Sequence, residues 1–326
     1  MPLFLSESDV RRLLTVEMAL DGVESAHRDL ALGQALDTPR QRSRLPQTVL
    51  HILQGALPAQ GVLGYKAYTS NRSGNRFHVH LFDAARGELR AVLEADYLGM
   101  MRTGAVSGLA ARYLARPDSR IAGVFGAGWQ AEGHIRALCA VLPLERVKVF
   151  ARDRDKLQKF CARLSAATGV DVVPAASAEE TVRGSDIIGT VTTAAEPLFD
   201  ADWLEEGAHI NAAGSNSLIR QEVSEAAIGR CQLIAVDTVT AALAEAGDLL
   251  PLLEKGRLQP RQLVELGDII IGRRQGREQA SDITLFESQG MAIQDLAVAV
   301  RLVAAAEAAG FARQWPSMPE ESDLTQ

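Results

Sequence analysis

The chain has 326 residues, and its 34 lysines and arginines against 41 aspartates and glutamates give a formal net charge of −7. Hydrophobic residues make up 47% and charged residues 23%; this excludes wholesale disorder and, at about 150 residues per domain, indicates two globular domains. Because the balance is acidic and no basic run is longer than Arg273 and Arg274, the sequence argues against a nucleic-acid partner and an anionic membrane surface.

The three cysteines are far apart in the sequence and show no paired spacing. Cys139, Cys161 and Cys231 therefore indicate neither a disulfide framework nor a zinc knuckle, and a reducing, cytoplasmic location fits them best. The chain starts with only a short apolar run before its first charges, and it contains no stretch of about 18 uncharged apolar residues. We therefore expect neither a secretion signal nor a membrane span.

Helices are expected first, followed by an antiparallel sheet. Ser6 with Asp9 three residues later resembles a helix N-cap, and Thr15 opens a second run with apolar residues at helical spacing. From 48 to 95 the chain changes to short alternating runs broken by glycine or turn residues, a pattern that predicts antiparallel strands.

The pattern changes again at Arg120, where apolar strands begin to alternate with helices. This alternation is typical of a parallel sheet with crossover helices, so the expected fold class is α/β with a Rossmann-type dinucleotide-binding domain. After Asp237 we expect helical stretches over 249–255 and 262–266, then a last strand over 282–288 and a long helix from about Met291.

A glycine-rich turn, GAGWQA, joins the first of these strands to its helix. Gly126 permits the tight turn, Gly128 lets backbone approach a pyrophosphate, and the small Ala131 allows the helix to pack closely on the strand. The free N–H groups at the helix start then face the anion. A purely structural glycine turn is the alternative, but the position at the first of several strand–helix units favours a nicotinamide dinucleotide.

The end of the second strand, in RVKVFARDRDK, bears on the choice of cofactor. An acidic residue there would bind the ribose 2′-hydroxyl, whereas an arginine suits a 2′-phosphate. Ala151 occupies the acidic position and Arg152 follows it, which favours NADP(H), although Asp153 could still turn toward the ribose of NAD(H). As a third interpretation, these charged residues bind no cofactor and form a solvated cluster at the start of the next helix.

Five segments in order, GYKAYT, RTGAVSGLAARYLA, GAGWQA, AHINAAGSN and LFESQGMAIQDLA, resemble the ornithine cyclodeaminase and mu-crystallin family. The resemblance implies a discontinuous arrangement. Residues 1–116 and 291–326 would form a substrate-binding and dimerisation domain, and residues 117–290 the inserted dinucleotide domain. It also implies a homodimer and a small imino-acid or amino-acid substrate.

The resemblance also assigns site residues. Arg42 matches an arginine that holds the substrate carboxylate, with Arg40 or Arg44 as alternatives, and Arg102 matches a second one. Lys66 matches the active-site lysine. We expect the remaining contacts to the cofactor from Thr103, Gly126, Ala127, Gly128, Gln130, Ala131, Arg152, Thr192 and Ser288.

Physical arguments support the substrate residues. A bidentate arginine fixes a carboxylate through charge-assisted hydrogen bonds in a planar geometry. Lys66 lies in a largely apolar strand, and desolvation would lower its pKa enough for proton exchange near neutral pH. Taken from composition alone, a lysine in a strand is usually a solvated edge residue.

Two departures from the cyclodeaminases each remove a carboxylate. Asn216 stands where those enzymes carry an aspartate, and His51 falls where a glutamate is expected. Asparagine can orient a substrate nitrogen but cannot take its proton. The sequence therefore favours a NAD(P)H-dependent reductase of an α-imino acid over a cyclodeaminase with recycled NAD; alanine dehydrogenase activity and a non-catalytic binding protein are further alternatives.

The histidines point to no metal site. His78 and His80 share one face of a strand, but no third ligand has a convincing spacing, so an outward polar face is the preferred interpretation. His209 precedes a strand end and is expected to be a hydrogen-bonded structural residue.

Overall fold

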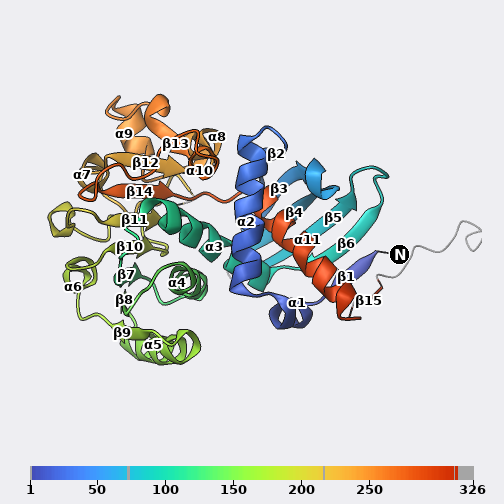
Figure 1. The fold of residues 1–326 in the computed structure, drawn as a ribbon, viewed down its shortest axis with the longest axis horizontal. Coiled ribbons are helices and arrows are strands. Elements are labelled where there is room, and N and C mark those ends of the chain that lie inside the picture. Colours follow the sequence, from blue (N-terminus) through green and yellow to red (C-terminus); the bar gives the residue numbers. More distant parts are fainter. Residues whose placement is uncertain (1, 72–73, 216, 312, 315–326) are drawn as a thin grey trace, which may run out of the picture.

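The computed structural model describes residues 2–71, 74–215, 217–311 and 313–314, which form two sheets with helices packed on them (Figure 1). The first sheet is mixed, with the strand order β15-β1-β6-β5-β4-β3-β2. Its strands are β1 (Leu3–Leu5), β2 (Leu36–Arg44), β3 (Val49–Leu57), β4 (Val62–Asn71), β5 (Gly74–Asp83), β6 (Leu89–Glu94) and β15 (Arg313–Gln314).

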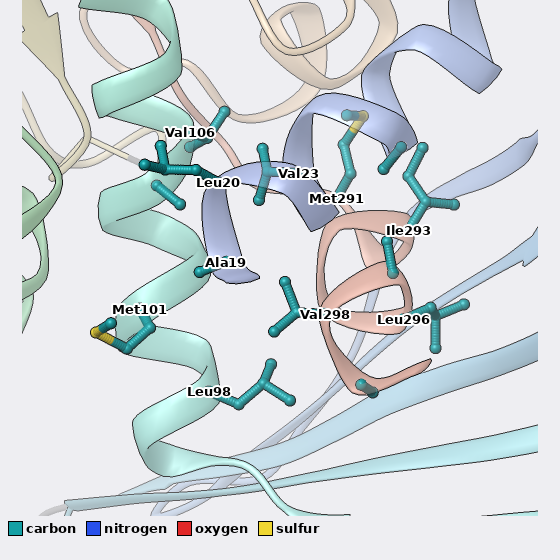
Figure 2. Packing of buried hydrophobic residues seen from close by; sticks show 14 of the residues in the cluster. Ala19, Leu20, Val23, Leu98, Met101, Val106, Met291, Ile293, Leu296 and Val298 are labelled. Carbon is teal, nitrogen blue, oxygen red and sulfur yellow. The ribbon is translucent and has the colours of Figure 1, made fainter. Parts of the chain in front are cut away.

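Helices at both ends of the chain pack on this sheet. Helix α1 (Glu7–Leu13) begins with the capping box of Ser6 and Asp9, and Thr15 caps α2 (Val16–Ala31), as the sequence predicts. Helix α11 (Ala292–Ala308) lies across β2, β3, β4 and β5, and α2 lies against α11 (Figure 1). Side chains from α2, α11 and α3 (Asp96–Leu114) interlock in one apolar cluster, where Leu20 lies beside Val106 and Val298 lies toward Leu98 (Figure 2).

The second sheet is entirely parallel, with the order β13-β12-β14-β11-β10-β7-β8-β9. The order reverses between β7 and β10, and in open sheets of this kind a ligand binds outside the carboxyl ends of the strands at such a point. The strands are β7 (Ile121–Phe125), β8 (Arg146–Phe150), β9 (Asp171–Pro174), β10 (Ile187–Thr190), β11 (His209–Ala212), β12 (Leu233–Val236), β13 (Leu263–Glu265) and β14 (Thr284–Glu287).

Short helices connect most of these strands, and two longer ones cover part of the sheet. They are α4 (Trp129–Val141), α5 (Arg154–Thr168), α6 (Ala178–Val182), α7 (Glu225–Gly229), α8 (Val239–Glu245), α9 (Leu250–Glu254) and α10 (Leu266–Ile270), with single 3₁₀ turns at Ala201–Trp203 and Pro260–Gln262. A further 3₁₀ turn, Pro58–Gln60, joins β3 to β4 in the first sheet. The expected α/β class with a Rossmann-type domain is confirmed.

Helix α3 connects the two sheets and packs closely on α4. Gly104 and Gly108, four residues apart in the RTGAVSG segment, lie on the face that meets α4. A Cβ atom at Gly104 would be 2.1 Å from the carbonyl oxygen of Gly133, so only glycine permits this approach. The segment that carries the family resemblance therefore also sets how close the two helices lie.

The elements that differ from the predictions include β1, β2 and the segment 262–266. β2 was not expected, because its run of polar and basic residues lacks an apolar alternation. β1 precedes the first helix and is only three residues long. The helix expected over 262–266 is wrong: Leu263–Glu265 is a strand that pairs with β12, and α10 starts only at Leu266. Here pairing with β12 outweighs local propensity.

Candidate active site

A cavity of about 410 Å³ lies where the two sheets meet. Its wall includes Lys66, Arg102 and Arg40 from the first sheet and its helices, together with residues at the carboxyl ends of the parallel strands. A second cavity of about 630 Å³ follows the glycine-rich turn, and the two share Gly128, Val191, Thr192 and Thr193. A ligand can therefore extend from one cavity into the other.

Lys66 is buried in the centre of the first sheet, with 2% of its surface exposed. Its Nζ donates to Asp295 Oδ1 at 2.9 Å and lies 4.9 Å from the centre of the Phe77 ring. Desolvation lowers the pKa of Lys66 to about 8; the Arg102 cation acts in the same direction and the Asp295 carboxylate opposes it. The expected inward direction and lowered pKa are thus present in the structure.

Arg102 projects from α3 to the same carboxylate. Its Nε donates to Asp295 Oδ1 at 3.1 Å, and its Nη1 donates to Gln294 Oε1 at 2.9 Å. The guanidinium is buried but lines the cavity, so Asp295 and Gln294 hold it on one side while the other side borders the cavity.

Two arginines of β2 share one carboxylate. Arg40 Nη1 lies 2.9 Å from Glu245 Oε2, and Arg42 Nη1 lies 2.7 Å from Glu245 Oε1. Arg40 also donates to the carbonyl oxygen of Gln289 at 2.8 Å and lines the cavity, whereas Arg42 is not among the residues of its wall. The structure therefore brings Arg40, with Lys66 and Arg102, to the cavity; the carboxylate contact of Arg42 stays a prediction.

The glycine-rich turn has the backbone that a dinucleotide requires. Gly126 adopts a φ of +113°, a conformation that residues with a side chain rarely adopt. Gly128 is the N-cap of α4, and no side chain caps this 13-residue helix, so its first N–H groups are free to face a phosphate. Ala127 lines the 630 Å³ cavity, and Ala131 is fully buried behind it.

The other expected cofactor residues lie around the two cavities. Thr192 lines both, and its backbone N and Oγ1 each donate to Glu222 Oε1 at 2.6 Å. Thr103, Gln130 and Ser288 line the 410 Å³ cavity. Ser288 Oγ donates to Asp237 Oδ2 at 3.0 Å, which fixes the loop that follows β14.

Arg152 lines the larger cavity and is exposed. Asp153 is the N-cap of α5: its carboxylate accepts from the backbone N of Lys156 at 3.1 Å and lies 3.3 Å from that residue's Nζ. Asp153 lines the cavity together with Arg152 and Lys156, so one carboxylate and two cations border it here.

Residues considered for other roles have structural partners. His51 Nε2 lies 2.9 Å from Ser70 Oγ, and His51 does not line the cavity, whereas Leu53, two residues further along β3, does. His80 stacks on Tyr65, and the buried His209 lies 2.9 Å from Thr284 Oγ1. Across the described parts of the chain, no group of three histidines, cysteines or acidic residues could hold a metal.

Asn216 lies outside the described residues. Among those described, sequence reasoning missed Asp295, Gln294, Trp129 and Arg220, of which the last two line the cavity. One signal could have indicated the first pair: QD interrupts an otherwise apolar helix, and a buried acidic residue is rare without a cationic partner.

No helix in the described ranges is both long and apolar enough to cross a membrane.

Known proteins resemble this chain along most of its length. The sequence model of the ornithine cyclodeaminase/mu-crystallin family matches residues 1–309. A Δ1-pyrroline-2-carboxylate reductase of Bacillus cereus is 38% identical over 222 residues, which is 68% of each chain.

Solved structures share the fold. A Δ1-pyrroline-2-carboxylate reductase of Thermococcus litoralis in complex with NADH and L-proline has a TM-score of 0.92 at 30% identity, covering 96% of this chain and 100% of that one. An archaeal alanine dehydrogenase dimer with bound NAD has a TM-score of 0.91 at 30% identity, with 97% and 99% coverage.

Proposed function

Because the chain belongs to the ornithine cyclodeaminase/mu-crystallin family, we propose that it is a NAD(P)H-dependent reductase that converts an α-imino acid into the amino acid. The observation that carries this proposal is the cavity in which Arg40, Lys66 and Arg102 face the glycine-rich turn. Three cations beside a groove for a dinucleotide suit an anionic substrate whose carbon–nitrogen double bond is reduced.

The residues divide the work between binding and proton transfer. Arg102 and Arg40 hold the substrate carboxylate and so fix the imine carbon toward the cofactor, which supplies a hydride when bound. Lys66 Nζ carries the proton that the nitrogen gains, so that C=N becomes CH–NH. Arg42, through Glu245, holds Arg40 in place, and a direct contact of Arg42 or Asn216 with the substrate remains part of the proposal.

The cofactor contacts are proposed as the sequence predicts them. The N–H groups of Gly128 and the following turn bind the pyrophosphate, and Thr103, Gln130, Thr192 and Ser288 lie along its path to the nicotinamide end. Arg152 and Lys156 line the larger cavity, and these two cations support NADP(H) over NAD(H).

We propose a homodimer in which the outer face of the first sheet is covered by a second copy. Leu63 and Leu50 on that face are 41% and 37% exposed, and Tyr65 stacks on His80 beside them. The sheet and its helices, residues 1–116 and 291–326, would form the substrate and dimerisation domain, and residues 117–290 the dinucleotide domain. The free thiols of all three cysteines support a cytoplasmic location.

A spectrophotometric assay tests the activity. Oxidation of NADPH and NADH is followed with pyrroline-2-carboxylate, piperideine-2-carboxylate, and pyruvate with methylamine; we expect turnover with at least one of these imines. Lys66→Met should lose turnover and keep cofactor binding, while Lys159→Met, which changes an exposed lysine of α5, should leave both unchanged.

A second assay tests the alternative, a cyclodeaminase, by incubating the protein with ornithine and a catalytic amount of NAD. Ammonia release from ornithine without net cofactor turnover, together with no reduction of any imine, would contradict the reductase and support a cyclodeaminase.

A further inference from the structure

One carboxylate oxygen connects the two cations of the active site. Asp295 Oδ1 accepts from Lys66 Nζ at 2.9 Å and from Arg102 Nε at 3.1 Å. The three residues come from α11, β4 and α3, which are far apart in the sequence. Asp295 is fully buried, so water does not screen these contacts.

The carboxylate offsets a repulsion that the site would otherwise contain. Arg102 and Arg40 both disfavour the charged form of Lys66, and Asp295 is the group that favours it. Without this anion, the lysine would be a desolvated cation facing two arginines, and it would lose its proton at a lower pH.

Asp295 and its neighbour Gln294 also connect this site to the loop on the cofactor side. Gln294 accepts from Arg102 at 2.9 Å and donates through Nε2 to Asp237 Oδ1 at 2.9 Å. The other oxygen of Asp237 accepts from Ser288 Oγ and from the backbone N of Gln289 and Gly290. The first turn of α11 thus fixes Lys66 and Arg102 relative to the loop that lines the cavity at residues 288–290.

We propose that Asp295 is a positioning residue of the imine reductase, which holds Lys66 and Arg102 as one unit and keeps the lysine protonated for transfer to the substrate nitrogen. This inference rests on the proposed function. Asp295 does not line the cavity, so it acts through the two cations and not on the substrate.

The test compares Asp295→Asn with the wild-type holoenzyme. Asparagine keeps the shape and one oxygen acceptor but removes the charge. The chain has five lysines, at positions 66, 148, 156, 159 and 255, so a lysine NMR titration resolves few signals, and Lys66→Met assigns the signal of Lys66. We expect its pKa to fall from about 8 by about one unit or more, kcat to fall about tenfold or more, and the Kd for NADPH to stay within about twofold.

Two further variants separate positioning from folding. Glu307→Gln removes a carboxylate from the exposed end of the same helix and should change neither the pKa nor kcat. If Asp295→Asn does not fold, the double variant Lys66→Met with Asp295→Asn tests whether the two residues form a pair, because it removes one cation together with its anion. Recovery of folding in the double variant supports the pairing, and failure to recover overturns it.

An unchanged Lys66 pKa with kcat within about twofold of the wild type in Asp295→Asn also overturns the proposal. The titration needs no catalysis. If the wild-type chain reduces no imine, the proposed function fails, while the shift of the Lys66 signal still decides whether Asp295 controls the lysine.

Discussion

Lys66 combines two properties that a single residue rarely has: it is a cation, and its side chain is almost completely removed from water. Its pKa is lowered from the ordinary 10.5 to about 8, mainly by desolvation. Below pH 8 the folded protein therefore carries a buried charge, which lowers its free energy of unfolding. Between about pH 8 and 10.5 only the unfolded chain still binds this proton, so the free energy of unfolding rises with pH over that range. In the proposed mechanism, this buried amine is the proton donor near neutral pH.

The pH dependence of both activity and stability follows. The rate of imine reduction should fall as the pH rises through about 8, because Lys66 loses the proton that it donates in the proposed mechanism. Lys66→Met removes this titrating group, so the rise in the free energy of unfolding that we expect of the wild type between pH 8 and 10.5 should be absent from the variant. Urea unfolding at several pH values measures it; an equal rise in both proteins would contradict the account.

Arg152 permits a prediction on cofactor choice. Arg152→Ala should raise the KM for NADPH about tenfold or more, because a charge-assisted contact to the 2′-phosphate is lost, and should change the KM for NADH less than about twofold. Lys159→Ala, which removes an exposed cation that does not line the cavity, is the control. Equal effects on both cofactors would speak against a phosphate contact at Arg152.

For single residues, the sequence could predict a role where the residue lies in a recognisable motif. Lys66, Arg102 and the glycine-rich turn lie in such segments. Asp295 could not be assigned a role, because its partners are 229 and 193 positions away and meet it only when α11 packs on β4 and α3. The choice between Arg40 and Arg42 depends on a register shift in β2 between Thr38 and Gln41, which no sequence pattern shows.

Among the elements, helices and strands with a strong periodicity or a capping residue were predictable. α1 and α2 begin at the expected caps, and the parallel strands follow the expected apolar runs. β2 and β13 were missed for the opposite reason: β2 is polar along much of its length, and β13 is a three-residue strand defined by its pairing with β12. Elements that depend on a partner strand carry little local signal.

The contact between α3 and α4 yields a prediction at the same scale. Gly104→Ala would place a Cβ atom 2.1 Å from the Gly133 carbonyl oxygen, so the two helices must separate. We expect the free energy of unfolding to fall by about 2 kcal/mol or more, although alanine is the better helix former. Gly229→Ala, where a Cβ atom meets nothing within 4 Å, is the matched control, and equal stability of the two variants would contradict the tight packing.

For the whole molecule, the outer face of the first sheet is the surface on which the proposed dimer depends. Leu63→Glu places a charge among Tyr65 and the neighbouring apolar residues, and we expect it to shift the protein from dimer to monomer in sedimentation velocity. Leu243→Glu changes an equally exposed leucine on α8 and should leave the assembly unchanged. A wild-type monomer, or a dimer that Leu63→Glu does not weaken, would place the interface elsewhere or remove it.

In the proposed function the two sheets contribute different parts of the active site: the parallel sheet provides the groove for the dinucleotide, and the first sheet provides the cations that line the cavity for the substrate. Transfer of the hydride across this junction is the central claim, and an isotope measures it directly. With NADPH carrying deuterium at the transferred position of its nicotinamide C4, reduction of pyrroline-2-carboxylate should yield proline one mass unit heavier, with the label on the α-carbon. Unlabelled proline, or no proline at all while ornithine releases ammonia, would contradict the account.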